Sequence, residues 1–236
     1  MKIKTLLLIT FLAALVGCAA PLQYPIKLDT TTLMSPDIRL GVATSVLPQP
    51  SLMLPGADCL LCMAVAASAN STLSTYTKTL STAQIEALKG EVIETLKARG
   101  KAPVVVADPI AVVELPKTKK LGEGFSRRDF SSLAEPLQVD QLLVIDITQA
   151  GMTRPYAAYV PRASPQARVS GAVYMVDVKT NAFSWYMPVD YHLSAEGEWD
   201  EPPEYPALTN SYYQLLEKLR DEVLAAFPVK PKETGE

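Results

Sequence analysis

Three long β-strand patterns in the second half of the chain constrain the fold more than any other feature. The run "DQLLVIDITQAGM" at 140–152 has the strongest strand pattern in the sequence. The segments "ARVSGAVYMVDV" and "AFSWYMPVDYHL" flank "KTN" at 179–181, where Asn181 can adopt the positive φ that a tight hairpin turn requires. The sequence therefore predicts a strand followed by a hairpin, and the remaining elements must pack against this sheet.

Two helix patterns each carry one apolar face. Ser81 and Gln84 have the spacing of a capping box at the start of the first, and Gly100 supplies the residue that ends it. Its predicted apolar face consists of Ile85, Leu88, Val92 and Leu96. The second helix is predicted from about Asn210 to Phe227, with an apolar stripe of Tyr212, Leu215, Leu219, Val223 and Phe227.

Weaker signals complete the body of the chain. They predict a strand at 37–46, a short buried strand at 102–108 and a short helix near 129–135. We predict one further helix from about Cys59 to Leu80, whose small residues "AVAASANS" allow another backbone to approach closely. Proline-rich loops are predicted at 47–58 and 154–166.

This order of elements predicts the class of fold. A strand, a helix pair, a strand, a short helix, a strand, a hairpin and a helix favour an α/β fold. We expect a single-domain sandwich over 37–227, in which helices pack a mixed β-sheet of about five strands and which ends in a hairpin and a C-terminal helix. Residues 228–236 are expected to form a flexible tail.

The charge of the chain excludes one class of partner. The net charge is −3, and removal of residues 1–17 would take away Lys2 and Lys4 and leave −5. Phosphate contacts need clustered lysine and arginine side chains, and the pattern shows no block of basic residues of that kind. We therefore expect no nucleic-acid partner.

The N-terminus has the pattern of a secretory signal. Lys2 and Lys4 precede the apolar run 6–16, which is shorter than the ~20 residues that a membrane-spanning helix needs. The sequence "LVGC" at 15–18 resembles the lipobox of bacterial lipoproteins. The resemblance implies cleavage after residue 17, acylation of Cys18 and, because Ala19 is not an aspartate, sorting to the outer membrane. We then expect residues 18–36 to form a lipidated tether and the domain to face the periplasm; an ordinary signal cleaved elsewhere is the alternative.

Cys59 and Cys62 have the spacing of a redox dithiol. In an oxidising compartment such neighbouring cysteines favour a disulfide. A catalytic dithiol would need an exposed thiol at a helix N-terminus, and Asp58 opposes a thiolate there while the two intervening leucines favour burial. A structural disulfide is the favoured interpretation, and a thiol–disulfide oxidoreductase is the alternative.

A wider resemblance comes from the hairpin. The segment from "DQLLVIDITQAGM" to "FSWYMPV" is similar to the core of small envelope lipoproteins of the curli-secretion and TolB N-terminal-domain type. In those proteins, a "DxLLVIxI" strand precedes a hairpin that reads roughly "VDxKTGxxxW". The residues that match this pattern are Asp177, Lys179, Thr180 and Trp185, with Asn181 where a glycine is usual. The resemblance implies an assembly or accessory role in the envelope.

Apart from the Cys59–Cys62 pair, the sequence has no motif that would carry catalysis. His192 is the single histidine, and no "GxSxG" or "GxGxxG" sequence or metal-ligand cluster accompanies it. We therefore predict a protein that is not an enzyme and has no cofactor and no metal site. The acidic segment 196–205 is interpreted as a solvated loop, with recognition of a partner as the alternative.

Exposed apolar and aromatic residues in loops are the candidates for partner contact. These candidates are Leu52, Met53, Leu54, Tyr156, Tyr159, Trp199 and Tyr205. We predict an outer-membrane lipoprotein, bound to the membrane through its lipid, that binds an envelope protein partner without catalysis. A subunit of an oligomeric export or assembly complex, in which the partner includes further copies of the chain, is a second possibility.

Overall fold

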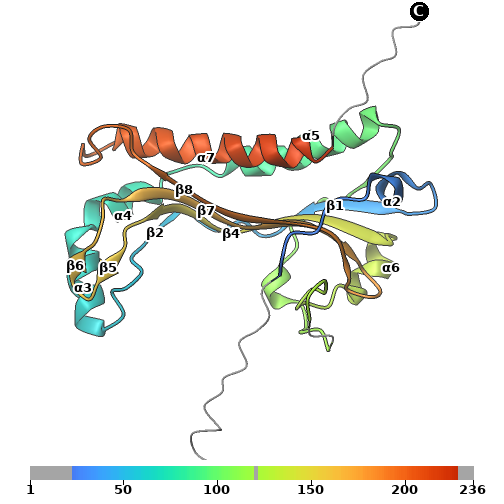
Figure 1. Cartoon of the computed structure of the whole chain (residues 1–236), viewed down its shortest axis with the longest axis horizontal. Coiled ribbons are helices and arrows are strands. Elements are labelled where there is room, and N and C mark those ends of the chain that lie inside the picture. Colours follow the sequence, from blue (N-terminus) through green and yellow to red (C-terminus); the bar gives the residue numbers. More distant parts are fainter. Residues whose placement is uncertain (1–22, 120–121, 228–236) are drawn as a thin grey trace, which may run out of the picture.

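The computed structural model describes residues 23–119 and 122–227. Its main element is a six-stranded mixed sheet with the order β3-β1-β4-β7-β8, in which β2 also pairs with β4 (Figure 1). The strands are β1 Leu40–Thr44, β2 Ser51–Met53, β3 Val104–Val105, β4 Gln141–Thr153, β7 Gln166–Asp177 and β8 Phe183–Ser194. β1 is parallel to β3 and β4, whereas β4, β7 and β8 are antiparallel. The predicted mixed α/β class is confirmed.

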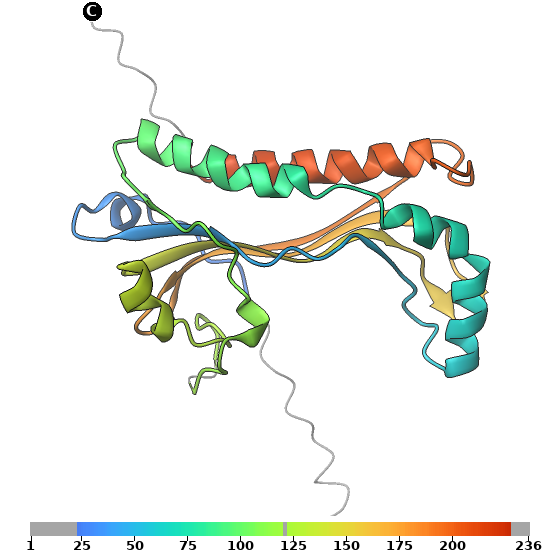
Figure 2. The same ribbon diagram turned by 180° about the vertical axis from the view of Figure 1, so that it is seen from behind.

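Two long helices cover one face of this sheet. The described residues form α2 Thr30–Met34, α3 Leu60–Ala69, α4 Ser71–Thr77, α5 Ala83–Ala98, α6 Ala134–Leu137 and α7 Pro206–Ala225. α5 and α7 lie side by side across the sheet, and both views place them in the same layer (Figures 1 and 2). Short 3-10 turns at 112–114 and 131–133, together with α6, lie on the opposite face.

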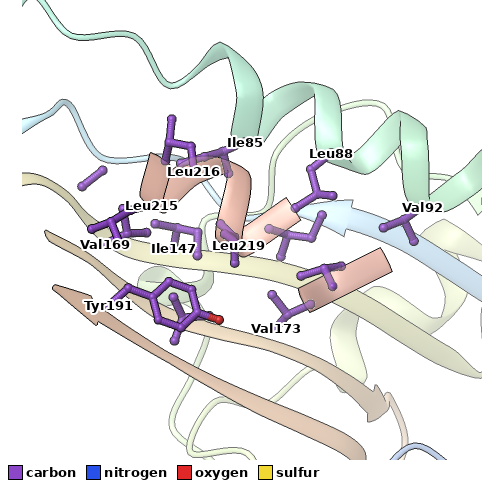
Figure 3. Packing of buried hydrophobic residues seen from close by; sticks show 14 of the residues in the cluster. Ile85, Leu88, Val92, Ile147, Val169, Val173, Tyr191, Leu215, Leu216 and Leu219 are labelled. Carbon is purple, nitrogen blue, oxygen red and sulfur yellow. The ribbon is translucent and has the colours of Figure 1, made fainter. Parts of the chain in front are cut away.

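The main core fills the space between the sheet and the α5–α7 layer. Figure 3 shows Leu88 and Val92 of α5 and Leu215 and Leu219 of α7 between the helices and the strands, and Ile85 and Leu216 are buried in the same core. On the strands, the side chains that pack in this core include those of Ile147, Val169, Val173 and Tyr191. The predicted apolar faces of both helices are confirmed, because 3.6-residue periodicity places each of these side chains on the face that loses contact with water.

The hairpin between β7 and β8 turns where the sequence predicts. Asn181 has φ +61°, and its side chain is used as well: Oδ1 accepts the N–H of Phe130 at 2.7 Å and Nδ2 donates to Asp129 Oδ1 at 2.9 Å. The Asp177 carboxylate accepts the N–H of Thr180 at 2.7 Å. The turn thus anchors the segment that covers the second face of the sheet.

Two predicted loops contain strands. Within 47–58, β2 pairs with the last residues of β4, so that β1 and β2 follow one another along the same edge of that long strand. Within 154–166, β5 Tyr156–Ala157 and β6 Val160–Pro161 form a small hairpin. These pairs escaped the sequence analysis because strands of two or three residues carry too few side chains for an alternating pattern.

The helix predicted from Cys59 to Leu80 is interrupted. Asn70 separates α3 from α4, since its backbone leaves the helical conformation with φ −118° and ψ 19°. The strand predicted at 102–108 is also different: β3 lies at the edge of the sheet and its two valines are exposed, which corrects the prediction of a buried strand. The cap of α5 moves by one residue, from Ser81 to Thr82, and the helix near 129–135 forms as a 3-10 turn followed by α6.

The segment predicted as a tether is partly folded. Residues 1–22 and 228–236 lie outside the described residues, but 23–36 pack on the domain. Ile26 pairs with Tyr186 of β8, Asp29 caps α2, and Leu33 is buried in the main core. The tether prediction is therefore wrong for the described part of this segment, in which Ile26 and Leu33 are too apolar to remain in solvent.

Candidate functional site

Most of the residues that the sequence singled out lie at one end of the sheet, where α3, α4, β2 and the β5–β6 hairpin meet (Figure 1). A small hydrophobic cluster holds this end together, and it consists of Ala57, Cys62, Ala66 and Tyr156 with Leu54 packed against it. Gly56 permits the packing, because its φ is +87° and a Cβ there would collide with the carbonyl oxygen of Tyr156. This end therefore has its own small core, separate from the cores on the two faces of the sheet.

Asn70 ties the elements of this end together. Its Nδ2 donates to the Ala66 carbonyl and to the Tyr156 hydroxyl, each at 2.7 Å. Its Oδ1 accepts a hydrogen bond of 2.8 Å from Nη1 of Arg154. The same guanidinium lies 4.8 Å above the ring of Trp199. One buried amide thus connects two helices, the hairpin and the acidic segment before α7.

Cys59 and Cys62 lie at disulfide distance at the start of α3, with Cα atoms 4.9 Å apart. Cys59 is the N-cap residue and is exposed, and its Sγ accepts the N–H of Cys62, which is buried. In the bridged form this pair offers no thiol. If the bridge is reduced, Cys59 is the exposed thiol at a helix N-terminus, which is the position that redox chemistry requires.

The surface of α3 is unusually apolar. Leu60 is 94% exposed and Leu61 is 71% exposed, and Met63 and Val65 are exposed too; we call these four residues the apolar tip. Residues 59–77 contain no charged side chain. Soluble proteins rarely leave such a group of large apolar side chains in water unless it binds something.

The residues predicted for partner contact fall into three groups. Met53 and Tyr159 are exposed at the same end of the sheet as the apolar tip. Leu52, Leu54 and Trp199 are half-buried. Tyr156 and Tyr205 are only 7% and 3% exposed, which corrects the expectation that they are surface anchors. Tyr156 hydrogen bonds to Asn70, and the ring of Tyr205 lies 5.5 Å from that of Tyr76. These two tyrosines hold the end together from inside.

The apolar tip could not be predicted from the sequence pattern. The two leucines between the cysteines were expected to be buried, but they are the most exposed large apolar residues among those described. The signal was present in another form: α3 is apolar on every side, so its periodicity selects no face for burial. The small core at this end of the domain buries only Cys62 and Ala66 of α3, so the other apolar side chains of the helix stay exposed.

Groups for acid–base chemistry are scattered. His192 is on β8 at the sheet surface, with Nε2 3.2 Å from Asp190 Oδ1. The acidic side chains of the segment 196–205 are exposed, and their identities are Glu196, Glu198, Asp200, Glu201 and Glu204. In the described ranges, no group of three or more His, Cys, Asp or Glu side chains is arranged to hold a metal ion.

One carboxyl group is largely withdrawn from water. Asp146 on β4 accepts a hydrogen bond of 3.2 Å from the Tyr174 hydroxyl. Burial raises the pKa of Asp146 above its ordinary value, and the nearby hydroxyls of Ser45 and Tyr174 lower it in part. The Ser45 hydroxyl is close enough for this effect but lacks the geometry of a full hydrogen bond. Asp146 borders a cavity of about 260 Å³, which Glu114 and the hydroxyl-bearing residues Ser45 and Thr148 also line.

Cys18, the predicted lipid-attachment residue, lies outside the described residues. Across 23–119 and 122–227, no helix is both long and apolar enough to cross a bilayer.

Comparisons with known proteins add little. No protein-family profile matches the chain, and no curated protein matches it. Among solved structures, the chain is similar to lipoprotein GNA1162 from Neisseria meningitidis, with 16% sequence identity over 79% of this chain and 96% of that chain and a TM-score of 0.29. A likeness at this TM-score establishes neither a shared fold nor a function.

Proposed function

We propose that the chain is a lipid-anchored protein of the bacterial outer membrane, acylated at Cys18 and facing the periplasm, which acts as a binding or assembly accessory without catalysing a reaction. The observation that carries a binding role is the apolar tip, because exposed leucines grouped on a surface serve association.

The anchor follows from the resemblance of "LVGC" at 15–18 to a lipobox. Each buried methylene of an acyl chain contributes about 0.8 kcal/mol, so two or more long chains hold a protein on a membrane far more firmly than one chain does. Attachment of that kind would place the domain permanently beside the bilayer.

Cys18→Ser tests the anchor. We expect the variant to remain an unacylated precursor that is lost from the outer-membrane fraction, with mass spectrometry of the wild-type N-terminus showing a modified Cys18. The double variant Cys59→Ser/Cys62→Ser is the matched control, and it should be acylated and sorted normally. A wild-type chain that begins at another residue without lipid would refute this part of the proposal.

Affinity capture from membranes tests the accessory role. The acylated protein should retain a specific envelope protein that Cys18→Ser does not retain at equal expression. Recovery of the chain alone, under mild detergents that preserve known envelope complexes, would argue against an accessory role.

A second candidate function is that of a subunit in a homo-oligomeric complex, and the edge of the sheet favours it. β3 offers an unpaired strand edge on which Val105 is 53% exposed, and an adjoining cavity of about 640 Å³ is lined by Leu133 and Leu137. Free edges of this kind pair with other strands. Light scattering of the detergent-extracted protein should then detect an assembly that Val105→Lys dissociates; a wild-type monomer at every concentration would exclude it.

The third candidate is a thiol–disulfide enzyme, which the exposure of Cys59 at the start of α3 favours. Alkylation of the reduced protein at graded pH measures the relevant pKa. A Cys59 thiol that reacts at a pH well below the ordinary pKa of about 8.5 would support this activity, and an ordinary profile would dismiss it.

A further inference from the structure

Exposed apolar side chains are unevenly distributed around the molecule. Among the described residues, none of the exposed large hydrophobic side chains belongs to α5 or α7. α3 begins at the lowest point of its end of the molecule and rises towards α4, on the side of the sheet away from α5 and α7 (Figures 1 and 2). α3, which carries the apolar tip, therefore lies on the side of the sheet opposite the helical layer.

A basic loop extends on that same side. Residues 115–128 contain five lysines and arginines and one glutamate, a cluster that the acidic net charge conceals and that the sequence analysis overlooked. Lys117, Lys119 and Arg127 are exposed. Arg128 Nη1 donates to the carbonyl of Leu115 at 2.9 Å, which closes the loop on itself. Both views show this loop beneath the sheet (Figures 1 and 2).

Acidic charge gathers on the opposite side. The acidic loop 196–204 contains five carboxylates and no basic residue, and it leads directly into α7. In Figures 1 and 2 it lies at the level of the α5–α7 layer. Glu114 and Asp129 flank the basic loop, so the positive charge on this side is confined to the loop itself. An anionic surface would attract the basic loop and repel the acidic loop, which would turn the basic loop towards that surface.

The described chain starts beside the basic loop. Gln23 Oε1 accepts the N–H of Gly124 at 2.7 Å. Cys18 precedes Gln23 by five residues, which span at most about 18 Å even when fully extended. A lipid on Cys18 would consequently keep the basic loop close to the headgroups.

From the positions of the apolar tip, the basic loop and the start of the described chain, we propose that the side of the sheet opposite α5 and α7 rests on an anionic lipid bilayer. Leu60 and Leu61 insert into the interface, and the basic loop lies on the headgroups. The orientation rests on the proposed acylation of Cys18, whereas the affinity of the surface itself does not. The apolar tip then has a lipid occupant, and the α5–α7 layer and the β3 edge remain open to protein partners.

Depth-dependent quenching tests the orientation. We would reconstitute the acylated full chain in vesicles that contain brominated lipids and compare Leu61→Trp with Tyr213→Trp, a conservative control on α7. The added fluorescence of Leu61→Trp should be strongly quenched and that of Tyr213→Trp should not. Equal quenching of the two, or quenching at Tyr213→Trp alone, would overturn the proposed orientation.

Sedimentation with vesicles tests the surface without the lipid. The Cys18→Ser chain lacking residues 1–17 should bind vesicles of phosphatidylcholine and phosphatidylglycerol. Leu60→Ser/Leu61→Ser should weaken this binding by more than about tenfold, because two apolar side chains no longer leave water. Lys117→Gln/Lys119→Gln should weaken it by about tenfold or more at low salt on anionic vesicles and leave binding to pure phosphatidylcholine unchanged.

Lys97→Gln/Lys218→Gln, which removes the same charge from the α5–α7 layer, is the control and should bind as the parent chain does. Equal binding by all variants, or no binding by the parent, would refute the membrane surface while leaving acylation intact. Conversely, vesicle binding without acylation at Cys18 in cells would refute the proposed anchor and not this surface. Loss of a captured protein in Leu60→Ser/Leu61→Ser, with vesicle binding and quenching unchanged, would assign the apolar tip to a protein partner instead.

Discussion

Asn181 shows how one residue can serve both the turn and the packing of a face. A glycine would accept the positive φ of +61° but could not accept from Phe130 or donate to Asp129. We therefore expect Asn181→Gly to lower the free energy of unfolding by about 1–3 kcal/mol, since buried partners lose their hydrogen bonds. Asn181→Ala should cost more, because its backbone is strained as well. Urea unfolding measures both, and a Gly variant as stable as the wild type would contradict the role given to the side chain.

Asp140 and Asp146 should give opposite pH dependences of stability. The Arg39 guanidinium binds both oxygens of Asp140 at 3.0 Å and lowers its pKa to about 2. Because the pKa of Asp140 is lower in the folded state than in the unfolded chain, the ion pair stabilises the fold at pH values above the ordinary pKa of 3.8. This contribution to stability is lost as the pH falls from 3.8 to about 2. In Asp140→Asn, the unfolding free energy should depend less on pH across that acid range. An unchanged acid dependence in this variant would contradict the ion pair's contribution.

The raised pKa of Asp146 works in the other direction. Its folded form binds a proton more tightly than the unfolded chain, so stability should fall as the pH rises above 3.8 and through the raised value. Asp146→Asn should remove this loss, with Asp190→Asn, an exposed aspartate on β8, as the control. Urea unfolding at a series of pH values checks the prediction, and an Asp146→Asn profile parallel to that of the wild type would refute it.

At the scale of elements, amphipathic periodicity predicted well and uniform composition did not. α5 and α7 were predicted with the correct buried faces because one stripe of each is apolar and the other polar. α3 and α4 were predicted as one helix, since a single asparagine among alanine, serine and threonine is only a weak signal for a helix end. Its partners Tyr156 and Arg154 lie more than 80 positions away, and only the folded chain brings them together.

Asn70→Ala tests whether this amide governs the end of the sheet. The variant leaves the Arg154 guanidinium and the Tyr156 hydroxyl without a buried partner, so we expect a loss of about 1–3 kcal/mol in unfolding free energy. Asn210→Ala, at an exposed position of α7, should change stability by less than about 0.5 kcal/mol. Hydrogen exchange should accelerate selectively in α3 and α4. Unaltered exchange there would mean that the helices are held by the small core alone.

At the scale of the molecule, the candidate site combines segments whose relation the sequence conceals. The apolar tip, the basic loop and the start of the described chain come from residues near 60, 120 and 23, and the sheet topology brings them to one side. Composition predicted an acidic chain, but net charge averages away the separation between the basic loop and the acidic loop. The local sequence shows the composition of each segment, but the side of the sheet on which the segments lie depends on the order of β1, β4 and β8.

The folded segment 23–36 sets how far the domain can stand from a lipid at Cys18. If Leu33 and Ile26 are part of the domain, a chain that starts at residue 23 should be as stable as the full mature chain. A chain that starts at residue 37 should lose about 2–5 kcal/mol of unfolding free energy, because Leu33 leaves a gap in the main core. Leu33→Ala in the full chain should reproduce most of that loss. Equal stability of the two truncated chains would mean that this segment is a true tether, and the domain could then stand well clear of the headgroups.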